Sequence, residues 1–182
     1  KQLPATGFAP GVVTILPEQP ADKAYFDTDS IWLEIPGLGV RASIAGIPQA
    51  DDGTWDVSWL WQQVGWLQGT AYPTWSGNSA ITGHVYLPNG KPGPFVDINK
   101  LAYGDKIIVR AYGQKYIYAV RENKKVKPSD TSVLKHEDKA WLTLLTCLGY
   151  NESNNTYASR VAVRAVLMTV EEDITRTQNK NR

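Results

Sequence analysis

The chain has 182 residues, with 19 Lys and Arg against 18 Asp and Glu. This length suits one domain of ordinary size, and the balanced charge excludes the strongly basic face of a nucleic-acid-binding protein. The one cysteine excludes an internal disulfide and a zinc site of paired cysteines, and two histidines argue against a histidine-based metal cage. We therefore expect no metal, no cofactor and no nucleic-acid partner.

The first thirty residues predict an extended arm. They carry four prolines among small and acidic residues, Pro4, Pro10, Pro17 and Pro20. Proline fixes its own backbone and restricts the residue before it, so regular structure is disfavoured here. Residues 1–30 are therefore predicted to be an appendage to the domain that follows.

From Ile31 onward the chain has the pattern of an all-β barrel or sandwich. Short apolar or alternating runs rich in Val, Ile, Tyr and Trp are separated by Gly, Pro and Asp. The predicted strands are Ile31–Ile35, Gly39–Ile44, Ser79–Gly83, Lys106–Ala111, Lys115–Val126, Leu142–Thr146 and Arg160–Val170. Gly113 favours a tight hairpin over residues 111–115, because glycine readily adopts a positive φ.

Helical signal is weak by comparison. A helix is predicted over residues 56–67, where Asp56 could cap a run of clustered Trp, Val and Leu, and one or two helical turns are predicted over residues 95–101. Residues 171–182 form a polar tail that we expect to fray. The sequence thus predicts one domain over residues 31–170 with an appendage at each end.

Two further patterns have plain structural interpretations. The aromatic block comprising Trp55, Trp59, Trp61, Trp66 and Trp75 predicts packing that seals a small barrel, since its spacing does not mark a sugar platform. Asp51-Asp52-Gly53 is typical of a turn rather than a calcium site.

Catalytic chemistry is indicated by Thr-Leu-Leu-Thr-Cys, residues 143–147, which ends on the single cysteine. His84 lies upstream and Arg160 downstream, so the chain offers a nucleophile, a proton-transferring imidazole and a permanent cation. Taken singly, Cys147 is more often core filler, His84 a structural histidine and Arg160 a surface cation. His136, in a charged segment, has no such support.

The ordered His, Cys and Arg, with Thr-Leu-x-Thr-Cys, resemble the sortase family of cysteine transpeptidases. The likeness runs from about Asn78 through Val170, including Tyr-Gly-Asp-Lys at 103–106 and Lys-Pro-Ser-Asp at 127–130. It implies an all-β fold, a closed β-barrel of about eight strands with one or two short helices. It also implies that Cys147, His84 and Arg160 are catalytic, with Arg164, four residues on, as the rival cation.

The same resemblance implies residues that bind substrate: Thr82, Gly83, Val133, Leu134 and Thr146. In sortases the segment equivalent to residues 128–134 walls the substrate groove, so Val133 and Leu134 would offer it an apolar surface. Both are equally suited to anchoring that loop in the core. Thr146 could orient the thiol or the bound carbonyl, or could simply be a β-branched strand residue.

The implied reaction is cleavage of a Leu-Pro-x-Thr-Gly sorting signal between Thr and Gly through a thioester, followed by transfer of the acyl group to an amine. The implied partners are secreted proteins with that signal and a cell-wall or pilin amine. The implied location is the outer face of a bacterial membrane, held by an anchor segment not present in this chain. A thiol peptidase hydrolysing the same bond and a non-catalytic peptide-binding barrel remain alternatives.

The arm itself contains such a signal, in Leu3, Pro4, Ala5, Thr6 and Gly7. A proline-containing arm explains these residues without any function. In a chain that resembles the cognate enzyme, they also suggest a tethered pseudosubstrate. The 24 steps from Gly7 to Ile31 can span roughly 80 Å when extended, so the arm could bind its own groove or a neighbour's.

Overall fold

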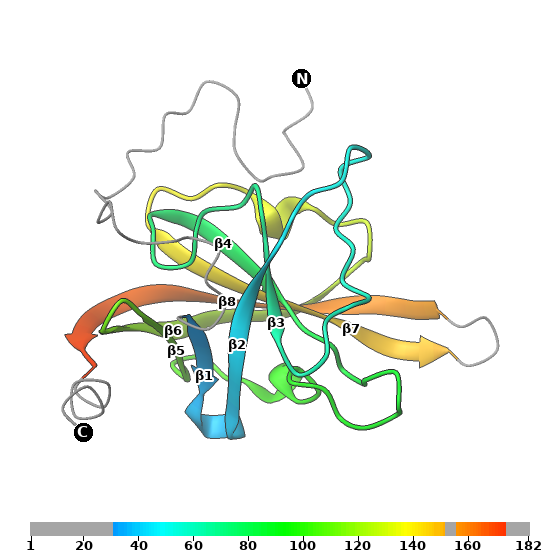
Figure 1. Cartoon of the computed structure of the whole chain (residues 1–182), viewed down its shortest axis with the longest axis horizontal. Coiled ribbons are helices and arrows are strands. Elements are labelled where there is room, and N and C mark those ends of the chain that lie inside the picture. The colour runs from blue at the N-terminus through cyan, green and yellow to red at the C-terminus, as the bar shows by residue number, and fades with distance from the viewer. Residues whose placement is uncertain (1–30, 152–155, 174–182) are drawn as a thin grey trace.

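The computed structural model describes residues 31–151 and 156–173, and these form a closed barrel of eight strands in the order β1-β2-β3-β4-β7-β8-β6-β5 (Figure 1). The strands are β1 (Trp32–Ile35), β2 (Val40–Ile47), β3 (Val64–Leu67), β4 (Gly77–Thr82), β5 (Lys106–Ala111), β6 (Gln114–Val126), β7 (Ala140–Asn151) and β8 (Thr156–Glu172). Three 3-10 helices of three residues each connect them: η1 (Pro36–Leu38), η2 (Ile98–Lys100) and η3 (Ser132–Leu134).

Two strand pairs are parallel, β2 with β3 and β4 with β7, and the remaining neighbours are antiparallel. Because parallel strands need a crossover connection, a long segment follows β2 and another follows β4. The first runs over residues 48–63 and the second begins at residue 83. Residues of both segments line the pockets next to Cys147.

Strand alternation gives the sheet two apolar faces. Successive side chains point to opposite faces of a strand, so Leu144 and Val163 belong to the interior core while their neighbours Leu145 and Ala162 belong to a second cluster. That second cluster lies under η3 and includes Val133 and Leu134. Both faces of β7 are therefore buried along its middle, which explains why Leu142, Leu144 and Leu145 do not alternate with exposed polar residues.

The predicted all-β barrel of about eight strands is confirmed, and each predicted strand is present. The helix predicted over residues 56–67 is wrong. Its last four residues are β3, which pairs with both β2 and β4. A Cβ at Gly65 would lie 2.0 Å from the Ile47 side chain, so sheet packing decides this segment. Of the one or two helical turns predicted over residues 95–101, the structure has one short 3-10 helix, η2.

The hairpin between β5 and β6 has a two-residue turn in which Tyr112 and Gly113 both have positive φ, 54° and 76°. A pair of left-handed residues is the geometry that suits the twist of a tight hairpin. The predicted tail begins later than expected, because β8 continues through Glu172 and Asp173 is buried in an ion pair with Arg110 at 2.6 Å. The arm over residues 1–30 and residues 174–182 lie outside the described residues.

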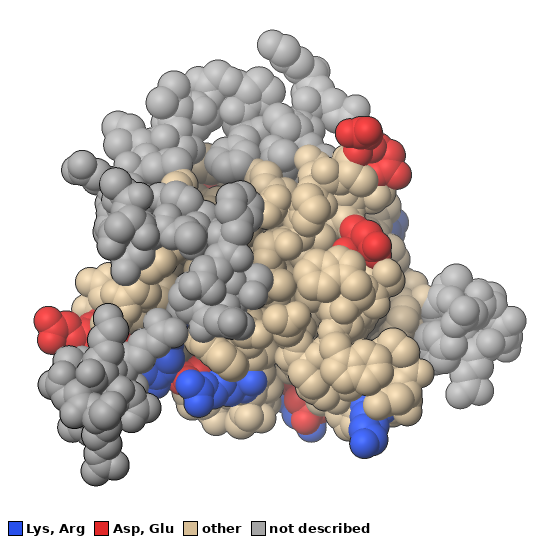
Figure 2. All heavy atoms as spheres, viewed as in Figure 1, with Lys and Arg blue, Asp and Glu red and all other residues tan. Residues whose placement is uncertain are grey.

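The tryptophan block divides into packed and exposed members. Trp66 and Trp75 pack on Tyr72 with ring centroids 5.1 and 5.3 Å apart, whereas Trp59 and Trp61 are about half exposed. On the face shown in Figure 2, charged side chains of both signs are scattered and neither sign forms a large patch. Among the described residues, no helix has the length and apolar character needed to cross a membrane.

Candidate active site

Cys147 and Arg160 are brought together by the β7–β8 ladder, in which they are directly opposite partners. Both lie on the outer face of the sheet, since Cys147 is two residues from Leu145 and Arg160 two residues from Ala162, and residues two apart in a strand share a face. Facing residues in an antiparallel pair have Cβ atoms only about 5 Å apart. Register alone therefore places the guanidinium stem beside the thiol, with Cys147 partly buried and Arg160 exposed.

His84 follows the end of β4, the neighbour of β7 on its other edge. Side-chain hydroxyls fasten these two strand ends together. The Thr146 hydroxyl donates to the Gly83 carbonyl at 2.7 Å, and the Thr82 hydroxyl donates to the Leu145 carbonyl at 3.2 Å. Gly83 immediately precedes His84, and Thr146 immediately precedes Cys147. The hydrogen bond between Thr146 and Gly83 therefore fixes the backbone next to both residues.

A second set of contacts holds the His84 backbone from the other side. Phe95 N–H donates to the His84 carbonyl at 3.0 Å, and Gly93 N–H donates to the Val85 carbonyl at 2.7 Å. A Cβ on Gly93 would lie 2.3 Å from the His84 carbonyl oxygen, and one on Gly83 would lie 2.8 Å from the Phe95 ring. Only glycine fits at either position, a requirement that sequence reasoning did not extract from Pro-Gly-Pro-Phe at 92–95.

The His84 imidazole is half-buried and has a main-chain partner in the β2–β3 crossover. Its Nε2 lies 3.1 Å from the Val57 carbonyl oxygen. A carbonyl oxygen only accepts, so this hydrogen bond requires the proton to be on Nε2. Sequence reasoning missed Val57 because its contribution is a backbone atom, which no side-chain pattern reports.

Burial raises the pKa of the Cys147 thiol, and the positive charge of Arg160 opposes only part of that effect. A free cysteine, with a pKa of about 8.5, is already mostly protonated at neutral pH. The resting residue is therefore a thiol rather than a thiolate. Nucleophilic chemistry by this thiol requires a base at the moment of attack, which is a role that an imidazole can fill.

Two hollows meet at Cys147 and both are lined by Thr146 and Cys147. We call the one on the Arg160 side the arginine hollow, and its volume is about 270 Å³. Its lining residues are Gly53, Thr54, Trp55, Val57, Leu67, Thr82, Leu145, Thr146, Cys147 and Arg160. The outer face of the sheet thus forms its floor and the β2–β3 crossover forms a wall.

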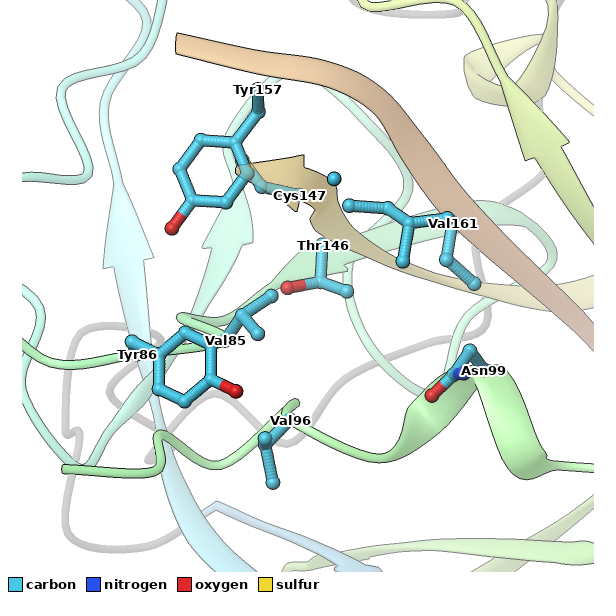
Figure 3. Close-up of a pocket in the computed structure, with 10 residues that line it drawn as sticks. Val85, Tyr86, Val96, Asn99, Thr146, Cys147, Tyr157 and Val161 are labelled. Carbon is cyan, nitrogen blue, oxygen red and sulfur yellow. The ribbon is translucent and has the colours of Figure 1, made fainter. Parts of the chain in front are cut away.

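We call the other one the tyrosine hollow; its volume is about 220 Å³. In Figure 3, Thr146, Cys147, Tyr157 and Val161 border it from strands β7 and β8. The segment from residue 85 to 99 closes it from the opposite side, with Val85, Tyr86, Val96 and Asn99. Cys147 therefore borders both hollows.

The residues predicted to bind substrate divide into two groups. Thr82 and Thr146 line the hollows and Gly83 joins them to His84. Val133 and Leu134 are buried in the second core cluster, and neither lines the two hollows at Cys147. Both pack on the outer face of the sheet, in the same cluster as Leu145.

Arg164, the rival cation, is held by a network further along the barrel. It pairs with Glu137, lies 3.6 Å from Glu122 and places its guanidinium 4.6 Å from the centre of the Trp141 ring. Its side chain is 16% exposed. With its charge matched by two carboxylates and its face covered by an indole, Arg164 has a structural role.

Comparison with known proteins gives one consistent result. The family model described as Sortase domain matches residues 33–168. A stretch of 81 residues, 44% of this chain, is 33% identical to Sortase A of Bacillus anthracis, and this match spans 38% of that relative's length.

Solved structures agree with the sequence match. Sortase C-1 of Actinomyces oris is 29% identical with a TM-score of 0.62, over 76% of this chain and 73% of that one. Sortase D5 of Clostridium perfringens is 27% identical with a TM-score of 0.60, over 77% and 79%. A lid mutant of Sortase A from Corynebacterium diphtheriae is 26% identical with a TM-score of 0.64, over 81% and 74%. With its barrel, its Cys147 and Arg160 ladder pair and the matching family model, the chain belongs to the sortase family.

Proposed function

We propose that this sortase is a cysteine transpeptidase in which Cys147 is the nucleophile, His84 transfers the proton and Arg160 stabilises developing negative charge. The observation that carries the proposal is the convergence of three separate segments at one edge of the barrel. The ladder pairs Cys147 with Arg160, and the Thr146 hydroxyl fastens the residue before Cys147 to the residue before His84.

In the first half-reaction the thiol adds to a peptide carbonyl while His84 takes its proton, so that an S–C bond forms and charge collects on oxygen. The guanidinium of Arg160 keeps its proton and can stabilise that oxyanion in a partly dry hollow. The C–N bond then breaks and the departing amine receives the proton from His84. A thioester on Cys147 remains.

In the second half-reaction an acceptor amine adds to the thioester and loses a proton to His84. The C–S bond then breaks, and the sulfur takes that proton back from His84 as the new amide is released. The two hollows favour transfer over plain hydrolysis. A transpeptidase needs room for an acyl chain and for an incoming amine at the same sulfur, and Cys147 lies between two hollows. We assign the acyl chain to the arginine hollow, where the guanidinium is, and the amine to the tyrosine hollow.

We propose a Leu-Pro-x-Thr-Gly-type signal on secreted proteins as the substrate, cleaved between Thr and Gly. The acceptor would be an amine of the cell wall or of a pilin, on the outer face of a bacterial membrane. The arginine hollow supports a peptide of this kind, since its lining combines apolar Leu67 and Leu145 with hydroxyl-bearing Thr54 and Thr82.

We also propose that the arm's own signal, Leu3 to Gly7, competes for the same hollow as a pseudosubstrate. These residues lie outside the described part of the chain, so the proposal rests on their sequence. Deleting residues 1–10 should raise the rate of peptide cleavage. An unchanged rate and KM would eliminate inhibition, and loss of residues 1–6 from the intact protein would show self-processing instead.

Product analysis tests transfer against hydrolysis. The protein is incubated with a Leu-Pro-x-Thr-Gly peptide, with and without a glycine-based amine, and the products are identified by mass spectrometry. We expect a new amide between the threonine and the amine whenever the amine is present. A threonine acid as the sole product at every amine concentration would favour the thiol peptidase.

A further inference from the structure

The β2–β3 crossover makes an unexpected contact with the site, because a backbone carbonyl rather than a side chain reaches the imidazole. The Val57 carbonyl oxygen lies 3.1 Å from His84 Nε2 and also accepts a hydrogen bond from Leu60 N–H at 3.2 Å. The Val57 carbonyl oxygen thus closes a turn and also binds the His84 imidazole. The position of the imidazole therefore depends on the stability of that turn.

The turn is fixed at both ends. The Asp56 carboxylate accepts from the Ser58 N–H at 2.9 Å and from the Ser58 hydroxyl at 2.6 Å. These two bonds lower the pKa of Asp56, so the carboxylate is ionised and the turn intact at neutral pH. At the other end Leu60 is 1% exposed and packs in the second core cluster.

The neighbouring part of the crossover is equally well held. The Trp55 indole donates to the Gln68 carbonyl at 3.0 Å, and the Gln49 side-chain amide donates to the Gly53 carbonyl at 3.0 Å. Gly53, Thr54, Trp55 and Val57 line the arginine hollow. The same segment therefore forms a wall for the peptide and holds the imidazole.

We propose that the Asp56–Leu60 turn is a positioning element that fixes the tautomer of His84: the Val57 carbonyl retains the Nε2 proton, so Nδ1 is the nitrogen that exchanges a proton with Cys147. This inference rests on the proposed role of His84. In the acylation step Nδ1 accepts the thiol proton as the S–C bond forms, and it gives that proton to the departing amine as the C–N bond breaks. The Nε2 proton stays on the imidazole throughout.

The tautomer can be read directly by nuclear magnetic resonance. The chain has two histidines, so comparing ¹⁵N-histidine-labelled protein with a His84→Gln variant assigns the His84 signals. The spectrum is recorded in the full chain carrying Cys147→Ala, at a pH high enough that a further increase no longer changes the His84 signals. We expect the long-range ¹H–¹⁵N couplings of the His84 ring to show the pattern of the tautomer protonated at Nε2. An Nδ1–H form would overturn the inference.

Kinetics of three variants test the turn. Asp56→Ala removes the acceptor for Ser58 and should lower kcat about tenfold with KM nearly unchanged, because small misplacements of a proton-transferring group are costly. Asp56→Asn keeps an acceptor oxygen and should restore both kcat and the Nε2–H form. Asp52→Ala removes a matching turn at Thr54, with bonds of 2.9 and 2.6 Å, and should leave the His84 tautomer unchanged.

The outcomes separate this inference from the proposed function. If the unaltered protein forms an acyl-enzyme but Asp56→Ala changes neither kcat nor tautomer, the turn does not position His84. A rise in kcat in Asp56→Ala would also overturn it, because the turn would then restrain the imidazole. If Cys147→Ala still cleaves peptide, the proposed function fails whatever tautomer is observed.

Discussion

Two arginines on the same face of β8, four residues apart, have opposite surroundings. Arg164 is enclosed by Glu137, Glu122 and the Trp141 ring. Arg160 is exposed beside Cys147, and no carboxylate in residues 31–151 or 156–173 forms an ion pair with it. A cation that serves the fold has its charge matched in the resting protein, whereas one that serves a reaction is available for charge that appears only in the transition state.

Replacing Arg160 should break this contrast most severely. Arg160→Ala removes the proposed oxyanion partner and should lower kcat/KM by about 10² to 10³-fold, the usual cost of losing one such donor. Arg160→Lys should recover little, because an ammonium lacks the planar fork of donors. The free energy of unfolding should change by less than about 0.5 kcal/mol, since the side chain is exposed. Peptide-cleavage kinetics measure kcat/KM, and thermal melts measure the change in stability. A stable and fully active Arg160→Ala would refute the role of Arg160 as the oxyanion partner.

Arg164→Met should show the reverse pattern. It loses the Glu137 and Glu122 pairs and the contact with Trp141, and it leaves Glu137, 33% exposed, without its cation. Because these glutamates are partly solvated, we expect about 1–2 kcal/mol of destabilisation in denaturant unfolding. Cleavage of peptide well below the melting temperature should stay within about threefold of the unaltered rate. A loss of activity as large as that of Arg160→Ala would make Arg164 the functional cation.

Thr146→Val tests the hydrogen bond that joins β7 to the residue after β4. Valine keeps the shape but leaves the Gly83 carbonyl without the hydroxyl that donates to it at 2.7 Å. We expect about 1 kcal/mol of destabilisation and a severalfold lower kcat, because His84 is attached to that strand end. Thr143→Val, deeper in β7, removes a buried hydroxyl that donates to Asn78 at 2.7 Å and is the matched control. It should destabilise similarly while leaving kcat unchanged.

The smallest effect concerns the ionisation of Cys147. Burial raises the pKa of the thiol and Arg160 lowers it, so alkylation by iodoacetamide should increase with pH and have its midpoint above that of free cysteine. Arg160→Gln removes the lowering influence and should move the midpoint further up. Arg164→Gln should leave it in place. A midpoint below that of free cysteine would indicate a resting thiolate and contradict the thiol form inferred here.

The sequence was sufficient to predict the barrel, because its strands leave a signal in residue type. The same kind of signal singled out Cys147, His84 and Arg160 as the proposed reactive side chains. Alternating apolar runs marked the strands, and the Thr-Leu-x-Thr-Cys motif marked Cys147. The short strand Val64–Leu67 was missed, since it follows tryptophans at a spacing that suits a helix and only pairing with β2 and β4 makes it a strand.

The surroundings of the site depended on contacts that residue type does not encode. Val57 contributes a carbonyl oxygen to the His84 imidazole. Gly93 matters because it has no side chain, which leaves room for the His84 carbonyl. Val133 and Leu134 are apolar residues suited equally to a groove and to a core, and only the packing under η3 places them in the core. The choice between Arg160 and Arg164 likewise rests on partners that are distant in sequence.

The most direct measurement is the intact mass of the protein after mixing with a Leu-Pro-x-Thr-Gly peptide. We expect a mass gain on Cys147 equal to the peptide fragment ending in threonine, and loss of that adduct when an amine is added. Cys147→Ala should show no gain. Turnover of the peptide by Cys147→Ala, or an adduct mapped to another residue, would show that this sulfur does not carry the acyl group.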